Sequence, residues 1–256
     1  MRVRMLWIAA LTAGAILAGA EGPVFEVATV KPWTPTGGPF PINLGFARRG
    51  KVSLTNVNML ECIRYAYDVA AESQIVGPDW IHSSELRYVI VGQAPPETKN
   101  EDLLRMTQAL LVERFHLILH KDKKPLPYFA LVVAKAGPNL APPKTGDYGV
   151  RLIAGHFDHG RMTLPMLGTL LSRVELARPV LDMTGLAGPF AIKLDWMPER
   201  RQGLPRPEGA AAAPQTDAAT SLYTALQEQL GLKLEARKGP VEVLVVDHAD
   251  KVPAEN

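Results

Sequence analysis

The amino-acid sequence predicts an α+β fold of two similar halves, each in the order β-α-β-β-α-β-β. One observation is a repeat, because "ERFHLILHKDKKPLPYFALVV" at 113–133 resembles "EQLGLKLEARKGPVEVLVVDH" at 228–248. Another is that in both copies leucines at helical spacing give way to apolar residues at every second position, as in a strand. This mixture predicts helices packed on mixed or antiparallel sheets.

The first predicted half spans residues 51–135. "KVSLTNVNMLECIRYAY" indicates a strand and then a helix, in which Asn58 and Glu61 have the spacing of a capping box. "QIVGPDWI" and "LRYVIVG" predict two strands separated by a turn, and a second helix begins at Asn100.

The end of this half predicts a strand, a turn and a last strand. In "FHLILH" apolar and other residues alternate, so His116 and His120 are expected on one face of a strand, roughly 13 Å apart and too far apart for one metal ion. The charged, proline-containing "KDKKPLP" is interpreted as a turn that leads into "YFALVVA".

The second predicted half spans residues 151–256. "GHFDHGRMTLPMLGTLLSRV" indicates a strand and a helix, with Thr163 as the cap and Pro165 in the first turn. "RPVLDMTGLAG" and "PFAIKLDW" predict two strands. The last helix contains Leu222, Leu226 and Leu230, and "RKGP" predicts the final turn before "VEVLVVDH".

Other segments complete the predicted domain organisation. Residues 1–20 are interpreted as a signal peptide, 21–50 as an extended N-terminal segment, 136–150 as a connecting loop and 203–219 as a linker rich in proline and alanine.

The signal peptide is predicted from Arg2 and Arg4, which precede an apolar run from Met5 to Ala20 that ends in Ala-Gly-Ala. About sixteen apolar residues fall short of the roughly 20 that a spanning helix needs. We therefore expect cleavage after Ala20, export to the periplasm or the extracellular space, and a mature chain without a membrane span.

Charge and cysteine content exclude two classes of protein. The chain has 28 basic and 26 acidic residues, and loss of Arg2 and Arg4 leaves 26 of each, so a mature chain lacks the basic footprint of a nucleic-acid-binding protein. Cys62 is the sole cysteine, which excludes an intramolecular disulfide. Its position in the first helix predicts a small core residue rather than a nucleophile.

Four ordered blocks resemble a known family: "FEVATVKP", "LLVERFHLILHKDKKPLPYFALVVAKAGPNL", "RPVLDMTGLAGPFAIKLDW" and the C-terminal stretch from "SLYTALQEQLGLKL". Residues 24–256 are thereby similar to a soil-associated family of exported bacterial proteins of unknown function. The resemblance implies that related domains occur fused to membrane metallopeptidases of the beta-lactam-sensor type. This sequence lacks their transmembrane region and an H-E-x-x-H zinc motif, so peptidase activity does not carry over.

The stretch "HFDH" contains the metal-ligand candidates His156, Asp158 and His159. On a strand His156 and Asp158 share a face, while His159 points away unless the chain turns. Because no third converging ligand can be named, solvated or turn histidines are the favoured interpretation. No metal or other cofactor is predicted.

Two tryptophans and one turn are the other candidates. Trp33 and Trp80 lie in proline-rich or turn segments, where an aromatic ring can form a ligand platform or pack over a sheet edge. "DMTG" at 182–185 differs from the D-T-G of aspartic proteases by one inserted residue. It predicts a turn in which Asp182 accepts a hydrogen bond from the backbone two residues later and Gly185 has an unusual φ.

The sequence contains no G-x-S-x-G, P-loop or dinucleotide fingerprint and singles out no catalytic residue. The leading hypothesis is an exported, non-catalytic module that binds an envelope protein or a small ligand. An exported hydrolase with an unrecognised, possibly metal-dependent site is the second hypothesis and depends on "HFDH". The third is a sensory ectodomain that acts with a separately encoded membrane protease, as the family resemblance suggests.

Overall fold

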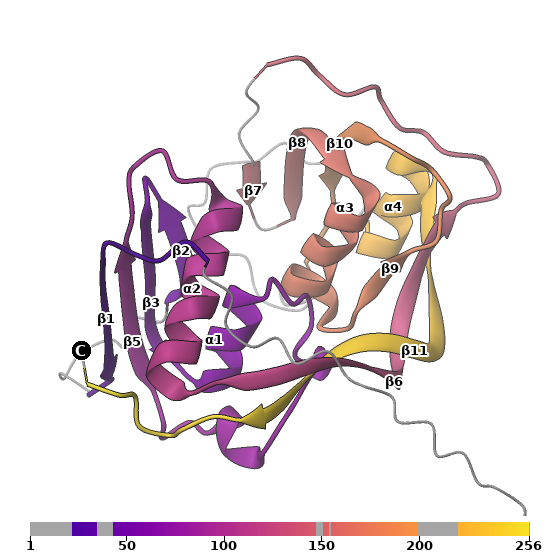
Figure 1. Cartoon of the computed structure of the whole chain (residues 1–256). Helices are drawn as coiled ribbons and strands as arrows, with labels where there is room; N and C mark the ends of the chain where they lie inside the picture. Colours follow the sequence, from indigo (N-terminus) through magenta and orange to yellow (C-terminus); the bar gives the residue numbers. More distant parts are fainter. Residues whose placement is uncertain (1–21, 35–42, 147–150, 154, 199–219, 256) are drawn as a thin grey trace, which may run out of the picture. The chain divides into compact units, whose positions relative to one another are not determined.

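The computed structural model describes residues 22–34, 43–146, 151–153, 155–198 and 220–255 (Figure 1). The predicted signal peptide and the predicted linker 203–219 lie outside these residues. The strands are β1 (Val27–Pro32), β2 (Asn43–Arg48), β3 (Lys51–Val57), β4 (Ile75–Val76), β5 (Tyr88–Gln93), β6 (Ile118–Val133), β7 (Arg151–Ile153), β8 (His156–Thr163), β9 (Val180–Asp182), β10 (Pro189–Asp195) and β11 (Leu232–His248).

The helices complete an α+β fold, which confirms the predicted class. They are α1 (Met59–Ala66), α2 (Asn100–Phe115), α3 (Leu164–Leu171) and α4 (Leu222–Leu230), with the short helical segments η1 (Glu72–Gln74), η2 (Asp79–His82) and η3 (Ser172–Leu176). No helix among the described residues combines the length and the apolar character that a membrane crossing requires.

The chain forms two compact units, and two of the boundaries between them fall within the long strands β6 and β11. The first unit consists of the described residues of Met1–Asp68, Ile75–Lys123 and Glu242–Asn256. The second consists of those of Val69–Gln74 and Lys124–Val241. Residues 124–135 therefore belong to the second unit and residues 242–255 to the first.

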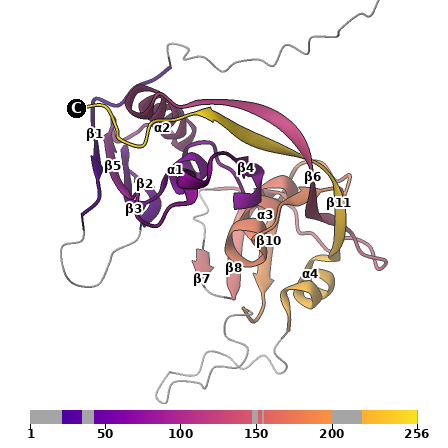
Figure 2. The same ribbon diagram turned by 90° about the horizontal axis from the view of Figure 1, so that it is seen from below.

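The first unit contains an antiparallel sheet in the order β1-β5-β3-β2. Buried and less buried residues alternate along β3 and β5, because successive side chains of a strand point to opposite faces. Helices α1 and α2 lie on one face of this sheet, as Figures 1 and 2 show from two directions. Their apolar sides close the core with Leu60, Ile63, Leu110 and Leu111, all nearly inaccessible to solvent.

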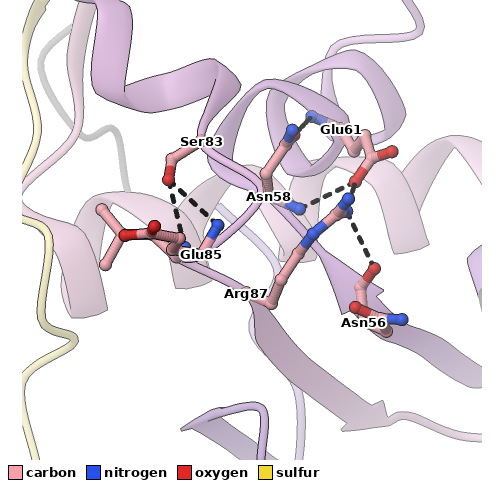
Figure 3. A network of polar contacts seen from close by, with 7 residues as sticks. Asn56, Asn58, Glu61, Ser83, Glu85 and Arg87 are labelled. Carbon is pink, nitrogen blue, oxygen red and sulfur yellow. Dashed lines mark hydrogen bonds and ion pairs between the residues drawn. The ribbon is translucent and has the colours of Figure 1, made fainter. Parts of the chain in front are cut away.

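The predicted capping box at the start of α1 is confirmed (Figure 3). Asn58 Oδ1 accepts from the Glu61 backbone N at 2.9 Å, and Glu61 Oε2 accepts from the Asn58 backbone N at 2.8 Å. Arg87 Nη1 donates to the same Glu61 oxygen at 2.7 Å and to the Asn56 carbonyl at 3.0 Å. Asn56 has a φ of +57°. Arg87 thus joins the start of α1 to an irregular residue of β3.

The second unit contains an antiparallel sheet in the order β10-β8-β7. Its core combines Phe157 of β8 and Leu194 of β10 with apolar residues of α3 and α4. The predicted start of α3 is confirmed, because the Thr163 hydroxyl accepts from the Met166 backbone N and Pro165 lies in the first turn.

The predicted turns "KDKKPLP" and "RKGP" were wrong, because both lie inside the continuous strands β6 and β11. Charged side chains at the centre of β6, such as Asp122 and Lys123, are exposed. These residues are polar because this part of the strand faces solvent, and the chain does not turn there. The described order is therefore β3-α1-β4-β5-α2-β6 in residues 51–135 and β7-β8-α3-β9-β10-α4-β11 in residues 151–256. In a further sheet of order β4-β11-β6-β9, β4 is parallel to β11 and β9 is parallel to β6.

The predicted position of His116 was also wrong. Helix α2 continues to Phe115, and His116 is its C-cap in the left-handed conformation, with a φ of 48°. β6 begins at Ile118, so His120 belongs to the strand but His116 does not. A left-handed residue is a common way to end a helix, and it redirects the chain into β6 here.

Candidate functional site

The three metal-ligand candidates of "HFDH" all lie on strand β8, but their side chains do not share one side of it. His156 pairs across the sheet with Asp195 of β10, and its Nδ1 contacts an Asp195 carboxylate oxygen. Asp158 lies two residues further along the same strand and pairs with Lys193. Opposite charges face each other at that position, as is favourable on an accessible sheet face.

His159 lies on the side of β8 that carries Phe157. The two rings stack with their centroids 6.3 Å apart and their planes at 12°, and His159 Nδ1 accepts from the Arg161 backbone N at 3.0 Å. Among the residues that the structure describes, no group of three or more His, Cys, Asp and Glu side chains is arranged to hold a metal ion. The geometry thus gives the metal-dependent hypothesis no convergent ligand set.

The remaining candidates occupy ordinary structural positions. Trp33 and Trp80 are both half-buried, and the Trp33 backbone N donates to the Arg87 carbonyl at 2.7 Å. Cys62 is fully buried in α1, and burial raises the pKa of its thiol, which disfavours the reactive thiolate. Cys62 is therefore the core residue that the sequence predicted.

The predicted "DMTG" turn is confirmed. Asp182 Oδ1 accepts from the Thr184 backbone N at 3.0 Å and from its hydroxyl at 2.7 Å. Gly185 has a φ of +72°. These local hydrogen bonds give Asp182 and Thr184 a structural role in a turn.

Sequence reasoning missed a group of histidines and aspartates in the first unit. His116 Nδ1 contacts Asp250 Oδ2 at 2.7 Å, and His248 Nε2 lies 3.3 Å from Asp250 Oδ1. His120 Nδ1 contacts Asp247 Oδ2 at 2.8 Å. The hydrogen bond from His116 is the main cause that lowers the pKa of Asp250, and the charges of His116 and His248 add to it.

The outer side of α3 exposes apolar side chains in the second unit. The helix reads "LPMLGTLL" and contains no charged residue. Leu164, Leu167 and Leu171 are buried in the core, whereas Met166 is 51% exposed and Val174, in η3, is 42% exposed. A surface helix normally carries polar residues on its outer side.

The residues at four-place intervals along this outer side form what we call the α3 surface: Met166, Leu170 and Val174. Leu170 is half-buried and also packs against the core. Two charged residues of η3 flank Val174: Arg173 donates to the Val69 carbonyl at 3.2 Å, and Glu175 is half-buried. The α3 surface is thus apolar at each of its three positions.

An aromatic and cationic group follows the end of η3. The Arg178 guanidinium carbon lies 5.9 Å from the centroid of the Phe129 ring, a cation–π arrangement. Phe129 in turn packs edge-on against Tyr223 of α4, with centroids 6.1 Å apart. Tyr223 is 39% exposed. These residue types are enriched in the centres of protein interfaces.

A family described as "Protein of unknown function (DUF3738)" matches residues 60–249. The chain belongs to this family. The match includes parts of both units, among them α3, Arg178 and Tyr223. No curated protein and no solved structure matches the chain.

The sequence did contain a signal for the α3 surface of this DUF3738 protein. Eight helical residues without a charge are expected to be buried all round. The sequence could not show that one side of α3 remains accessible to solvent, because exposure depends on the neighbours that the fold supplies.

Proposed function

We propose that this DUF3738 protein is an exported, non-catalytic module that binds a partner protein of the cell envelope through the α3 surface. The observation that carries the proposal is the exposure of two apolar side chains, Met166 on the uncharged helix α3 and Val174 in η3, which follows it. The pattern of residues 1–20 supports export, because it has the basic, apolar and small-residue regions of a signal peptide.

The energetics favour a partner with an apolar surface. Complete burial of a Met or Val side chain is worth about 1.5–3 kcal/mol, so covering these half-exposed residues contributes about 1 kcal/mol each. Arg178, which follows η3 in the sequence and lies over Phe129, suits a carboxylate or carbonyl acceptor on the partner. An apolar patch with an acidic or carbonyl-rich rim is the partner surface that fits best.

Family resemblance supports a more specific partner. Because the resemblance implies that related domains occur fused to membrane metallopeptidases, we propose a separately encoded membrane protease as the first partner to test. The protein would then act as its sensory ectodomain.

Site-specific photocrosslinking in the producing cell tests the binding surface. A photoreactive phenylalanine derivative replaces Met166 in one variant and Gln227, an exposed polar residue of α4, in the control. We expect one envelope protein to be captured at position 166 and little of it at position 227. Addition of Val174→Glu to the position 166 variant is expected to reduce capture by at least fivefold.

Equal capture at both positions, or no enriched partner at position 166, would contradict the proposed surface. The sequence of the N-terminus of the mature protein tests export separately, with Glu21 expected as the first residue. Retention of residues 1–20 would refute cleavage after Ala20 and leave the surface experiment interpretable.

A further inference from the structure

The C-terminal residues 249–255, which we call the C-terminal strap, lie against the C-terminal end of α2. Both views show the yellow end of the chain passing this end of the helix (Figures 1 and 2). The Asp250 backbone N donates to the Phe115 carbonyl and the Ala254 backbone N donates to the Arg114 carbonyl, each at 2.7 Å. The last carbonyls of a helix lack partners within the helix, so the strap supplies donors that α2 itself cannot.

Side chains add further attachments. The Tyr88 hydroxyl donates to the Lys251 carbonyl at 2.7 Å, and the Arg114 guanidinium donates to the Glu255 carbonyl. Tyr88 is almost fully buried and packs edge-on against Phe115, with centroids 5.0 Å apart. The strap therefore has one contact with a buried aromatic pair and several with the helix end.

The ionisable contacts of the strap meet at one carboxylate. The Asp250 carboxylate contacts His116, which follows the end of α2, and His248, which ends β11. All three side chains are at least 42% exposed, so protons exchange with solvent. His116 also follows the last turn of a helix, where the dipole favours a positive charge.

We propose that the C-terminal strap is a pH-dependent latch, closed most firmly at mildly acidic pH and released more often as His116 and His248 lose their protons. Release leaves the carbonyls of Arg114 and Phe115 without their strap donors. The fold thus contains a segment whose attachment to α2 responds to the pH of the compartment.

The sign of the effect follows from the two kinds of group. Asp250 has a lowered pKa, so its contribution is present above the pKa of an ordinary aspartate and is lost as the pH falls through its own lower value. An imidazole carries its charge below about pH 6.5. The attraction therefore operates between these limits and weakens above neutrality.

The other charged side chains near the strap have partners or positions of their own and do not take the place of His116 and His248 at Asp250. In the last turn of α2, Arg114 contacts Glu113 at 3.3 Å and bonds the Glu255 carbonyl, and it keeps its charge across this range. Further along the two strands, His120 is paired with Asp247. Lys251 follows Asp250 in the strap. The two imidazoles that contact Asp250 are those of His116 and His248.

Hydrogen exchange with mass spectrometry, on the mature chain 21–256, tests the latch. Protection of a peptide that covers 249–255 is measured at pH 5, 6, 7 and 8 and corrected for the intrinsic exchange rate at each pH. Exposed ion pairs correspond to a change of roughly 1.5- to 5-fold in an equilibrium constant. We expect the protection factor at pH 5 to exceed that at pH 8 by this factor.

Matched variants identify the groups responsible. His116→Gln with His248→Gln is expected to abolish the pH dependence, and Asp250→Asn is expected to do the same while it keeps both imidazoles. His120→Gln, which removes a pair on the same strands outside the strap, is expected to retain it. Equal protection at pH 5 and 8 in the unaltered protein, or an unchanged ratio in both Gln and Asn variants, would overturn the proposal.

Discussion

Replacement of Arg87 by methionine should destabilise the first unit by about 2–3 kcal/mol. The Arg87 and Glu61 side chains are only 20% and 19% exposed, and their N–O distance is 2.7 Å. Removal of one partner from a buried pair costs about 3–5 kcal/mol, because the other charge loses its compensation. Access of water to one fifth of each side chain reduces this cost, and loss of the bond to the Asn56 carbonyl adds to it.

A second arginine provides the control. Arg105 contacts Asp102 at 3.4 Å with side chains 63% and 37% exposed, so Arg105→Met should cost less than about 0.5 kcal/mol. Arg87→Met should also cost at least about 1 kcal/mol less in a Glu61→Gln background, where no carboxylate is left without a partner. These two comparisons separate the contribution of the charge pair from the loss of arginine packing.

Urea unfolding of the mature chain measures these differences. In a Trp196→Phe background the remaining tryptophans, Trp33 and Trp80, both belong to the first unit, so fluorescence reports that unit. Equal free energies of unfolding for Arg87→Met and Arg105→Met, within about 0.5 kcal/mol, would refute the reasoning. The interaction in Figure 3 would then be screened by solvent like an ordinary surface pair.

Three other predictions concern single positions. Gly231→Ala should cost about 1–3 kcal/mol more in urea unfolding than Gly185→Ala, since both have positive φ but only at Gly231 would a Cβ meet a backbone oxygen, at 2.1 Å; equal costs would show that the backbone moves aside. Cys62 should react with a thiol reagent only as fast as the protein opens, because it is buried and its thiol pKa is raised, and rapid labelling of folded protein would contradict this. Burial raises the pKa of Tyr67 and Tyr88 to about 12, so the unfolded chain releases their protons first and stability should fall as the pH rises from about 10 towards 12. Absorbance of tyrosinate and the urea midpoint measure this effect, and an unchanged midpoint between pH 9 and 11 would count against it.

Local signals in the sequence were sufficient for helix starts and tight turns. Asn58 and Glu61 form their capping box within one helical turn, and Asp182 forms its turn with Thr184. Each arrangement depends on residues two or three places apart. Such contacts form largely independently of the rest of the fold, which is why spacing predicted them.

Contacts between distant residues could not be predicted in this way. His116 and Asp250 are 134 positions apart, and the contact requires that the end of α2 and the end of β11 be brought together. The centre of β6 was misread for a related reason, because charges on an exposed strand resemble charges in a turn. The cap Thr163 and Pro165 predicted the helix α3, but exposure of Met166 depends on which neighbours the fold supplies.

The two proposals can be separated because the residues that carry them belong to different units. Asp250 and Arg87 lie in the first unit, whereas Met166 lies in the second. Arg87→Met should therefore reduce protection of the C-terminal strap through opening of the first unit, while capture at position 166 should stay within about twofold of that in the unaltered protein. Additivity of distant sites is the physical basis of this expectation. Loss of both signals would instead show that the units unfold as one cooperative body, and the strap and the α3 surface would then have to be tested under conditions that keep the variant folded.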